Sequence, residues 1–369
     1  MLADVQSVFV SVIGQEDNLG DSVLRRGLLE ALRSGGLQLY VLIGSNSDGY
    51  CRAAGLAEGD RVFRSRSEWL SSFSKMRPSE ATFVLNAGES QVHRRRLYLG
   101  GRQAASLILA RLRGAAIIQT GVGLRGADNG RLTVPPLALR MSNLVTWRDQ
   151  KSRDYARIGR VSPDWAFALG TPTAESSWAS PESDRQFLAI SMRGDRPAPT
   201  ATWYAGVRRA AEALQLTPVI LTQVRRDSSR SVEIAAKLGG GANAMEWHGE
   251  DHAAQETVVR EIYRQSGAVL SDRLHALIIG ATEGAVPVGY TVGSPEKVDR
   301  TLGAVGLRSS CFSAADENDP HRIVGIVQSD SRLSEIVSAA RADLAVLSKE
   351  MVGIAQRQPG SLASETAPR

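Results

Sequence analysis

The amino-acid sequence predicts an α/β protein with two Rossmann-like domains that face a central cleft. Short runs of β-branched residues alternate with helical stretches along most of the chain, which is typical of parallel sheets with right-handed crossovers. The alternation stops in a segment rich in Pro, Ser and Thr, residues 171–184, which predicts a linker. The chain has 369 residues, and a single hydrophobic core rarely grows beyond about 250 residues. Two domains of similar size are therefore expected.

The first half begins with a strand at residues 7–13, and an amphipathic helix at residues 21–33 follows it. Further apolar runs of strand length end at polar or Gly-bearing turns, and a helix is predicted between two of them at residues 102–113. These strands are expected at residues 37–43, 81–86, 115–120 and 143–147. The N-terminal domain is predicted to span residues 1–170.

The second half restarts the same alternation after the linker. Strands are expected at residues 186–192, 218–222, 242–246, 268–271 and 286–290, and helices at residues 202–214, 229–238, 255–265, 272–283 and 330–352. The C-terminal domain is predicted to span residues 185–352, and a polar tail follows at residues 353–369. Ligands of open parallel sheets bind outside the carboxyl ends of the strands, so the two domains predict a cleft that holds the chemistry.

Composition and charge exclude several classes of protein. Hydrophobic residues make up 43% and charged residues 22%, which excludes a disordered chain. The net charge of +5 is modest, and the basic run at residues 94–96 has no interleaved aromatic residues, so no nucleic-acid partner is expected. The two cysteines, Cys51 and Cys311, lie far apart and predict free thiols in a reducing compartment. An acidic start and a short apolar run predict neither a signal peptide nor stable membrane insertion, so we expect a cytoplasmic protein.

The turn between the first strand and the first helix reads Asn18-Leu19-Gly20-Asp21. Gly20 allows a tight turn, and Asn18 or Asp21 can cap the helix. The same residues can also place backbone N–H groups and a carboxylate beside a substrate hydroxyl or anion. The sequence leaves both interpretations open.

Three more glycines and an arginine lie at predicted strand ends. Gly88, Gly121 and Gly123 would let a ligand approach the backbone, although glycines also serve tight turns. Their spacing does not match GxGxxG, so NAD-dependent chemistry is not expected. Arg148 directly follows a predicted strand, where it either pairs with Asp149 or faces the cleft.

The sharpest signal is the run Ser-Asp-Arg-Leu-His at residues 271–275. Arg273 and His275 fall in the first turn of the helix that follows a buried strand, where the helix dipole favours anions over cations. Two cationic side chains at this position indicate that a ligand supplies the negative charge. The alternative is that His275 packs beneath the sheet and Arg273 pairs with Asp272.

The second half contains further polar residues that could bind a ligand or a metal. Arg193 follows the first strand of the second domain, and Lys297 follows the loop after its last strand, so both can face the cleft. His248 and His252 have the i, i+4 spacing of a metal pair, but their segment offers no third ligand. We expect an acidic, solvated turn there and no metal site.

In this order, the motifs resemble those of the polysaccharide pyruvyl transferase family. The resemblance spans about residues 10–305, and its most specific part is the Arg-Leu-His element with the apolar helix and strand that follow. The matching positions are residues 18–21 and 120–123, Arg148, Asp149, Ser152, Arg193, Arg273, Leu274, His275, Val286, Pro287, Tyr290 and Lys297. The resemblance implies a glycosyltransferase-B-like fold with the acceptor on the N-terminal domain and the donor on the C-terminal domain.

The resemblance also implies an activity. It implies transfer of pyruvate from phosphoenolpyruvate to two hydroxyls of a sugar in a cell-surface polysaccharide or glycolipid precursor, which forms a cyclic ketal and releases phosphate. Phosphoenolpyruvate is a co-substrate, and neither a cofactor nor a metal is implied. A lipid-linked acceptor would bring the protein to the inner face of the membrane.

The roles that the resemblance implies fall on the residues already named. His275 would be the general acid and Asp21 the acceptor-side base. Donor binding falls to Arg273, Arg193, Leu274 and Lys297, and the acceptor or cleft positions are Asn18, Gly20, Gly88, Gly121, Gly123 and Arg148.

One segment departs from the family pattern, and two other functions stay open. Residues 86–90 read Asn-Ala-Gly-Glu-Ser where the family usually has two or three glycines, which changes the acceptor side. The first alternative is a nucleotide-sugar-dependent glycosyltransferase of the glycosyltransferase-B type, which usually needs a glutamate on the ribose. Glu283 lies a full helix beyond His275 and is poorly placed for that role. The second alternative is a non-catalytic relative that binds an anion or a carbohydrate.

Overall fold

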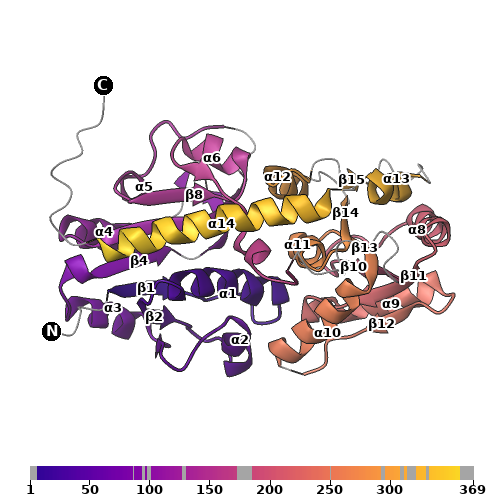
Figure 1. The fold of residues 1–369 in the computed structure, drawn as a ribbon, viewed down its shortest axis with the longest axis horizontal. Coiled ribbons are helices and arrows are strands. Elements are labelled where there is room, and N and C mark those ends of the chain that lie inside the picture. The colour runs from indigo at the N-terminus through magenta and orange to yellow at the C-terminus, as the bar shows by residue number, and fades with distance from the viewer. Residues whose placement is uncertain are drawn as a thin grey trace. The chain divides into compact units, whose positions relative to one another are not determined.

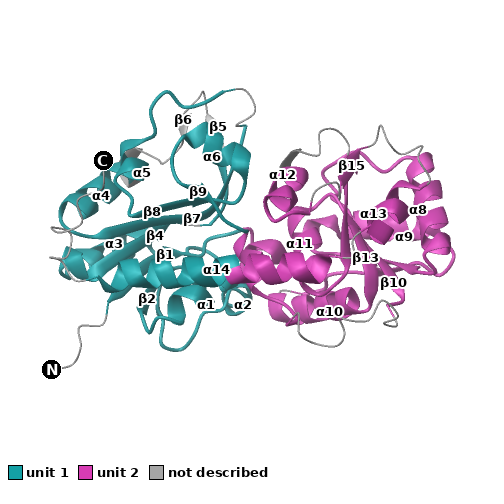
Figure 2. Ribbon diagram, turned by 45° about the horizontal axis from the view of Figure 1, so that its top comes forward, with its two compact units in different colours: residues 1–14, 24–163, 343–369 teal, residues 15–23, 164–342 magenta. Residues whose placement is uncertain are grey.

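The computed structural model describes residues 6–85, 87–93, 96–97, 101–126, 130–172, 185–249, 251–291, 296–307, 311–313, 321–329 and 332–357. Contacts divide the chain into two compact units, coloured teal and magenta in Figure 2. Unit 1 comprises Met1–Gly14, Leu24–Pro163 and Asp343–Arg369, and unit 2 comprises Gln15–Val23 and Asp164–Ala342.

Unit 1 contains a nine-stranded sheet in the order β3-β2-β1-β4-β7-β5-β6, with β8 pairing β7 and β9 pairing β8. Among the described strands every pair is parallel except β5 with β6. The strands are β1 Ser7–Ser11, β2 Gln38–Leu42, β3 Arg61–Phe63, β4 Ala81–Leu85, β5 Gly88–His93, β6 Arg96–Leu97, β7 Ala116–Arg125, β8 Leu144–Trp147 and β9 Arg160–Val161.

An aromatic cluster forms much of the core of unit 1. Phe9 of β1 stacks on Tyr40 of β2 at 4.7 Å and lies 5.1 Å from Phe83 of β4, and the edge of Trp69 meets its ring at 5.5 Å. The helices of this unit are the greater part of α1 Leu19–Arg33, then α2 Asp48–Ala53, α3 Arg66–Ser74, η1 Pro78–Glu80, α4 Gly101–Leu112, α5 Leu137–Arg140, α6 Gln150–Ala156 and the end of α14 Leu333–Gln356.

Unit 2 contains a six-stranded, all-parallel sheet in the order β12-β11-β10-β13-β14-β15. Its strands are β10 Phe187–Ser191, β11 Thr217–Leu221, β12 Asn243–Met245, β13 Ser266–Ser271, β14 Val286–Thr291 and β15 Cys311–Ser313. In chain order this is 3-2-1-4-5-6, the Rossmann arrangement, and the strand order reverses between β10 and β13. A ligand crevice is therefore expected where the loops after these two strands diverge.

The helices of unit 2 lie between its consecutive strands and at both ends of this series, and the gradual change of colour from β10 to α13 in Figure 1 follows this order. They are η2 Trp165–Ala168, α8 Ala201–Ala213, η3 Arg225–Asp227, α9 Ser228–Leu238, α10 His252–Arg264, α11 Leu274–Thr282, α12 Glu296–Ala304, α13 Arg322–Ser329 and the start of α14. Helix α11 is buried along almost its whole length, which explains its continuously apolar sequence.

The structure confirms the predicted α/β class with parallel sheets, and each predicted strand is present within a few residues of its predicted bounds. The largest difference is at β7, which continues to Arg125, so Gly121 and Gly123 lie inside a strand rather than after it. Gly121 has φ +66°, and the pairing of β7 with β8 shifts register between Gln119 and Val122. A bulge therefore explains that glycine.

The division into units differs from the predicted domain limits at three places. Residues 15–23 and 164–170 belong to unit 2, although they precede the predicted linker, and residues 343–352 belong to unit 1. The predicted polar tail begins too early, because α14 continues to Gln356 and buries Ile354 and Ala355. The predicted linker lies outside the described residues beyond residue 172.

Candidate anion site at the carboxyl edge of the second sheet

Two parallel strands deliver the predicted donor-binding residues to one place. Arg193 lies two residues after β10, and Asp272 and Arg273 directly follow β13, the neighbour of β10 in the sheet. The hydroxyl of Ser271 donates to the backbone carbonyl of Ser191 and ties the two strand ends together. Arg193 and Arg273 thus flank the point where the strand order reverses.

Arg273 is the N-cap residue of α11, and its backbone N–H donates to Ser271 Oγ at 2.9 Å. Its guanidinium pairs with Asp227 of η3, with Nε 2.5 Å from Oδ2. Both side chains are largely buried, with exposed fractions of 10% and 3%. Burial lowers the pKa of Arg273, and the nearby carboxylate of Asp227 opposes that shift. The sequence alternative of a direct Arg273–Asp272 pair is therefore wrong, because the partner is Asp227.

Arg193 binds one acid through its backbone and another through its side chain. Its backbone N–H donates to Asp272 Oδ1 at 2.9 Å, and its guanidinium donates twice to Asp195, at 2.8 and 2.6 Å. The double hydrogen bond from Arg193 lowers the pKa of Asp195 to about 2. Burial raises the pKa of Asp272 to about 6, against the opposing hydrogen bond from Arg193. Two guanidinium groups and three carboxyl groups therefore lie together where the crevice of unit 2 is expected.

His275 lies in the first turn of α11, and its side chain is 15% exposed. Its Nε2 is 3.5 Å from Oδ2 of Asp164, a fully buried carboxylate that also accepts from the Ala166 N–H at 3.0 Å. A Cβ at Gly20 would overlap the imidazole ring. A residue with a side chain is therefore excluded at Gly20 unless His275 moves, and two motifs far apart in the sequence meet here.

The segment around Gly20 is attached to unit 2 by backbone hydrogen bonds. Asn18 forms an antiparallel bridge with Val224, and the Leu19 N–H donates to the Gln223 carbonyl at 3.1 Å. Asn18 Oδ1 accepts from the Gly20 N–H at 3.0 Å, and Asp21 Oδ2 accepts from the Gln15 N–H at 2.8 Å. The polar residues of this turn thus shape the start of α1.

His252 is a structural residue in this arrangement. It is buried, its ring meets Trp247 edge-on at 4.7 Å, Nε2 contacts the Glu16 carbonyl, and Nδ1 is 3.4 Å from Ser22 Oγ. The predicted solvated turn is therefore wrong for His252, although His248 is exposed. Burial lowers the pKa of His252, which favours the neutral ring. Among the described residues, no three His, Cys, Asp or Glu side chains are grouped to hold a metal ion.

The predicted acceptor residues of unit 1 form a separate group. Arg148, 2% exposed, lies 3.7 Å from Glu89, and a Cβ at Gly123 would overlap its guanidinium. Glu89 also pairs with Arg125 at 2.5 Å. The negative charge of Glu89, which departs from the family pattern, is therefore compensated by arginines of unit 1.

The remaining residues of unit 1 have local roles as well. Asp149 caps α6 by accepting from the Ser152 N–H and hydroxyl, both at 2.8 Å. Gly88 begins β5 with φ +129°, a conformation that glycine adopts readily. A hollow of about 600 Å³ lies at the carboxyl ends of β2 and β3, lined by Ile43, Cys51 and Arg64 among others, and it contains none of the predicted site residues.

The structure thus brings Arg193, Arg273, His275 and Gly20 together in unit 2. Leu274 is buried in the core, and Lys297 lies in the first turn of α12, where its side chain is not described. Sequence reasoning missed the acids Asp164, Asp195 and Asp227 that contact the site. Asp227 could have been suspected, because it follows the end of β11 by only a few residues.

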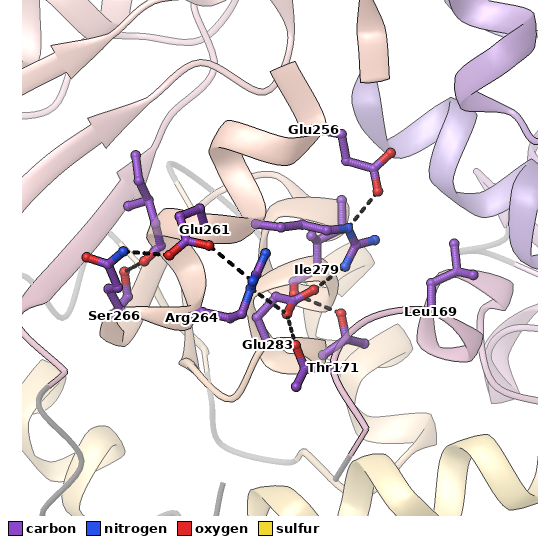
Figure 3. A network of polar contacts seen from close by, with 12 residues as sticks. Leu169, Thr171, Glu256, Glu261, Arg264, Ser266, Ile279 and Glu283 are labelled. Carbon is purple, nitrogen blue, oxygen red and sulfur yellow. Dashed lines mark hydrogen bonds and ion pairs between the residues drawn. The ribbon is translucent and has the colours of Figure 1, made fainter. Parts of the chain in front are cut away.

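Glu283 belongs to a different, buried network of hydrogen bonds and ion pairs, shown in Figure 3. Its Oε1 is 2.5 Å from Arg260, and its Oε2 accepts from the Thr171 hydroxyl at 2.5 Å and lies 3.5 Å from Arg264. Arg260 also pairs with Glu256 at 2.6 Å. A carboxylate that is 2% exposed and paired in this way is not available for a ribose.

No helix in the described parts of the chain combines the length and the apolar character needed to cross a membrane.

Comparisons with known proteins place this geometry in context. A family model described as polysaccharide pyruvyl transferase matches residues 18–294. No curated protein matches the chain.

Solved structures match at low identity. MnaA from S. aureus, in a co-structure with UDP, is 12% identical, with 94% of this chain and 95% of that chain covered and a TM-score of 0.53. A putative UDP-N-acetylglucosamine 2-epimerase from Listeria monocytogenes is 10% identical, with 94% and 95% covered and a TM-score of 0.57. The glycotransferase of kitacinnamycin is 11% identical, with 95% and 98% covered and a TM-score of 0.52. At these identities the likeness shows the fold alone, which is the glycosyltransferase-B-like type predicted from the sequence.

Proposed function

Because the chain belongs to the polysaccharide pyruvyl transferase family, we propose that it transfers pyruvate from phosphoenolpyruvate to two hydroxyls of a sugar. The product is a cyclic pyruvate ketal, and inorganic phosphate is released. The proposed acceptor is a cell-surface polysaccharide or glycolipid precursor. The proposed enzyme is cytoplasmic, uses phosphoenolpyruvate as a co-substrate and needs no cofactor, as expected from the sequence.

The observation that carries the proposal is the position of Arg193, Arg273 and His275 at the reversal of strand order in unit 2. Phosphoenolpyruvate presents a phosphate and a carboxylate on a small frame, and guanidinium groups match both anions with two parallel hydrogen bonds. The N-terminus of α11 adds unpaired N–H groups and a positive dipole end. Together these groups suit a small, multiply charged anion.

The reaction needs one proton on the methylene carbon of phosphoenolpyruvate and two additions to the neighbouring carbon. Protonation of the methylene carbon leaves positive charge on the carbon that bears the phosphate, and the first sugar hydroxyl attacks it and loses its proton. The bond from that carbon to the phosphate oxygen then breaks, and the second hydroxyl closes the ketal. One hydroxyl proton replaces the proton given to the methylene carbon, and the other leaves with phosphate.

His275 is the proposed donor of the first proton, and Asp21 is the proposed base for a sugar hydroxyl. The buried carboxylate of Asp164 beside Nε2 supports the role of His275, because it restricts the orientation of the ring. Gly20 supports it as well, since the missing side chain leaves the space that the ring occupies.

Thermal unfolding in the presence of phosphoenolpyruvate tests the proposal. A ligand that binds only the folded protein raises its stability by about 2.7 kcal/mol at a hundredfold excess over Kd. We expect stabilisation by phosphoenolpyruvate and a smaller effect of inorganic phosphate, UDP and GDP. The Arg273→Ala variant should lose the effect. Arg273→Lys, which keeps a positive charge beside Asp227, should retain the fold but bind more weakly.

Phosphate release from phosphoenolpyruvate that depends on a sugar diol completes the test. His275→Ala should abolish this release while phosphoenolpyruvate still stabilises the protein. Stabilisation by UDP or GDP alone would instead support a nucleotide-sugar-dependent glycosyltransferase. Binding of phosphoenolpyruvate without turnover on any diol would support a non-catalytic relative.

A further inference from the structure

Both guanidinium groups at the crevice of unit 2 are already paired with carboxylates. Arg273 pairs with Asp227, and Arg193 pairs with Asp195 through two hydrogen bonds. A donor with several negative charges therefore meets a crevice whose positive charges are compensated. Each carboxylate occupies the Nε and Nη2 edge of its arginine, so a donor can bind to that edge only after the pair opens.

The two ion pairs differ greatly in the free energy that is needed to separate them. Arg273 and Asp227 are 10% and 3% exposed, and Asp227 Oδ1 also accepts from the Gly194 N–H at 2.8 Å. Separating them would leave buried charges without partners, which is strongly unfavourable. Arg193 and Asp195 are 23% and 54% exposed, and a pair that is this much more exposed contributes less to stability than a buried pair.

The backbone beside the exposed pair is held in place. The Arg193 N–H is bound to Asp272, and the Gly194 N–H is bound to Asp227. A Cβ at Gly194 would lie 3.3 Å from Asp227 Oδ1, so the chain passes close to η3 at this point. Residues 194–198 are exposed beyond this anchor. Opening the pair therefore requires only a rotation of the Asp195 side chain into water.

We propose that Asp195 competes with the anionic donor for Arg193 and thereby sets the affinity of the crevice for that donor. The carboxylate of Asp195 occupies the Nε and Nη2 edge of Arg193, and a phosphate or carboxylate group of the donor replaces it there. The proposal rests on the proposed function for the identity of the donor, although it applies to any anion that reaches Arg193.

The electrostatics of the crevice agree with this role. The charge of Arg273 also lowers the pKa of Asp195, so Asp195 lies within reach of both arginines. With a pKa of about 2 it stays ionised at any pH near neutrality, and the competition is not relieved by protonation. Removing its charge should therefore raise the attraction of the crevice for anions throughout that range.

The Asp195→Asn variant tests the proposal. We expect the KM for phosphoenolpyruvate and the Kd for inorganic phosphate to fall about two- to fivefold, as the modest strength of an exposed pair allows. The effect should appear in KM and Kd, because Asp195 is proposed to act on donor binding. Asp195→Ala should behave alike. The gain should vanish when Arg193→Ala is combined with Asp195→Asn.

A matched control removes an exposed aspartate elsewhere. Asp48→Asn in unit 1 breaks the exposed pair with Arg64 at 2.8 Å and changes the net charge equally, and it should leave both constants unchanged. Unchanged or weaker anion binding by Asp195→Asn would overturn the proposal, since it would make Asp195 a support for Arg193. Tighter phosphate binding without any phosphoenolpyruvate binding would instead uphold the competition and overturn the proposed function.

Discussion

At the scale of single residues, the contact between Gly20 and His275 can be tested directly by substitution. Replacing a helical glycine by alanine usually stabilises a protein, because the unfolded chain then has less conformational freedom. At Gly20 the new Cβ would overlap the imidazole of His275. We therefore expect Gly20→Ala to destabilise the protein by about 1–3 kcal/mol, as overpacking usually does. We also expect a loss of at least about tenfold in kcat/KM, because His275 must move.

Gly206→Ala is the matched control for this prediction. Gly206 lies in α8, and a Cβ there would meet no atom within 4 Å. Thermal unfolding and turnover of the two variants should therefore diverge, with Gly206→Ala neutral or stabilised by up to about 1 kcal/mol and fully active. Equal behaviour of the two alanine variants would show that the ring of His275 is not fixed against α1.

The arginines and the histidine of the site could be predicted from the sequence, but their acidic partners could not. Arg273 and His275 stand in a distinctive run after an apolar strand, and the position of such a run at a strand end can be read from periodicity. The partner of Arg273 depends on which strands are neighbours in the sheet. Asp227 follows β11, and nothing local to Arg273 indicates that loop. The alternative that paired Arg273 with the adjacent Asp272 is therefore wrong.

At the scale of elements, the helices α10 and α11 are joined at their C-terminal ends by the network in Figure 3. Glu283 caps the end of α11 and is 2% exposed, with Arg260 and Arg264 of α10 as its partners. Glu283→Gln should lower the free energy of unfolding by about 3 kcal/mol, because Arg260 would lose one of its two buried carboxylates. Thermal or urea unfolding measures the loss.

Glu261→Gln in α10 is the control. Glu261 pairs with Arg264 at 3.1 Å, but both side chains are about half exposed, and the change should stay within about 0.5 kcal/mol. If Glu283→Gln left stability unchanged and weakened UDP binding, the carboxylate would be a nucleotide ligand and the structural role would be wrong.

The long strands and helices could be predicted from hydrophobic periodicity, whereas the short elements could not. β7 was predicted to end before Gly121, because glycine usually marks a turn, but a bulge lets the strand continue to Arg125. The short strand β3 and the helix α2 have too few residues to show a period, so neither was predicted.

At the scale of the whole molecule, each unit is built from segments that are far apart in the sequence. Residues 15–23 pair with the loop after β11 in unit 2, and residues 343–356 of α14 pack in unit 1. In Figure 1 the yellow end of α14 lies beside α1, where the Ser348 hydroxyl donates to the Ala31 carbonyl at 2.9 Å. The chain passes between the units at residues 14/15, 23/24, 163/164 and 342/343, and the segment rich in Pro, Ser and Thr at residues 171–184 coincides with none of these crossings. The crossings at 23/24 and 342/343 lie inside α1 and α14. Composition therefore could not reveal them.

The last turns of α14 should accordingly stabilise the first unit of the chain rather than the second. Met351 is fully buried there, and Met351→Ala should lower the free energy of unfolding by about 2–5 kcal/mol, as cavity-forming core substitutions do. Val346 on the same helix is 65% exposed, so Val346→Ala should change it by no more than about 0.5 kcal/mol. Hydrogen exchange locates the effect: in Met351→Ala, amides of β1 and β2 should exchange faster, while those of β10 and β13 stay protected. Faster exchange confined to β10 and β13 would assign the end of the chain to unit 2, where the sequence had placed it.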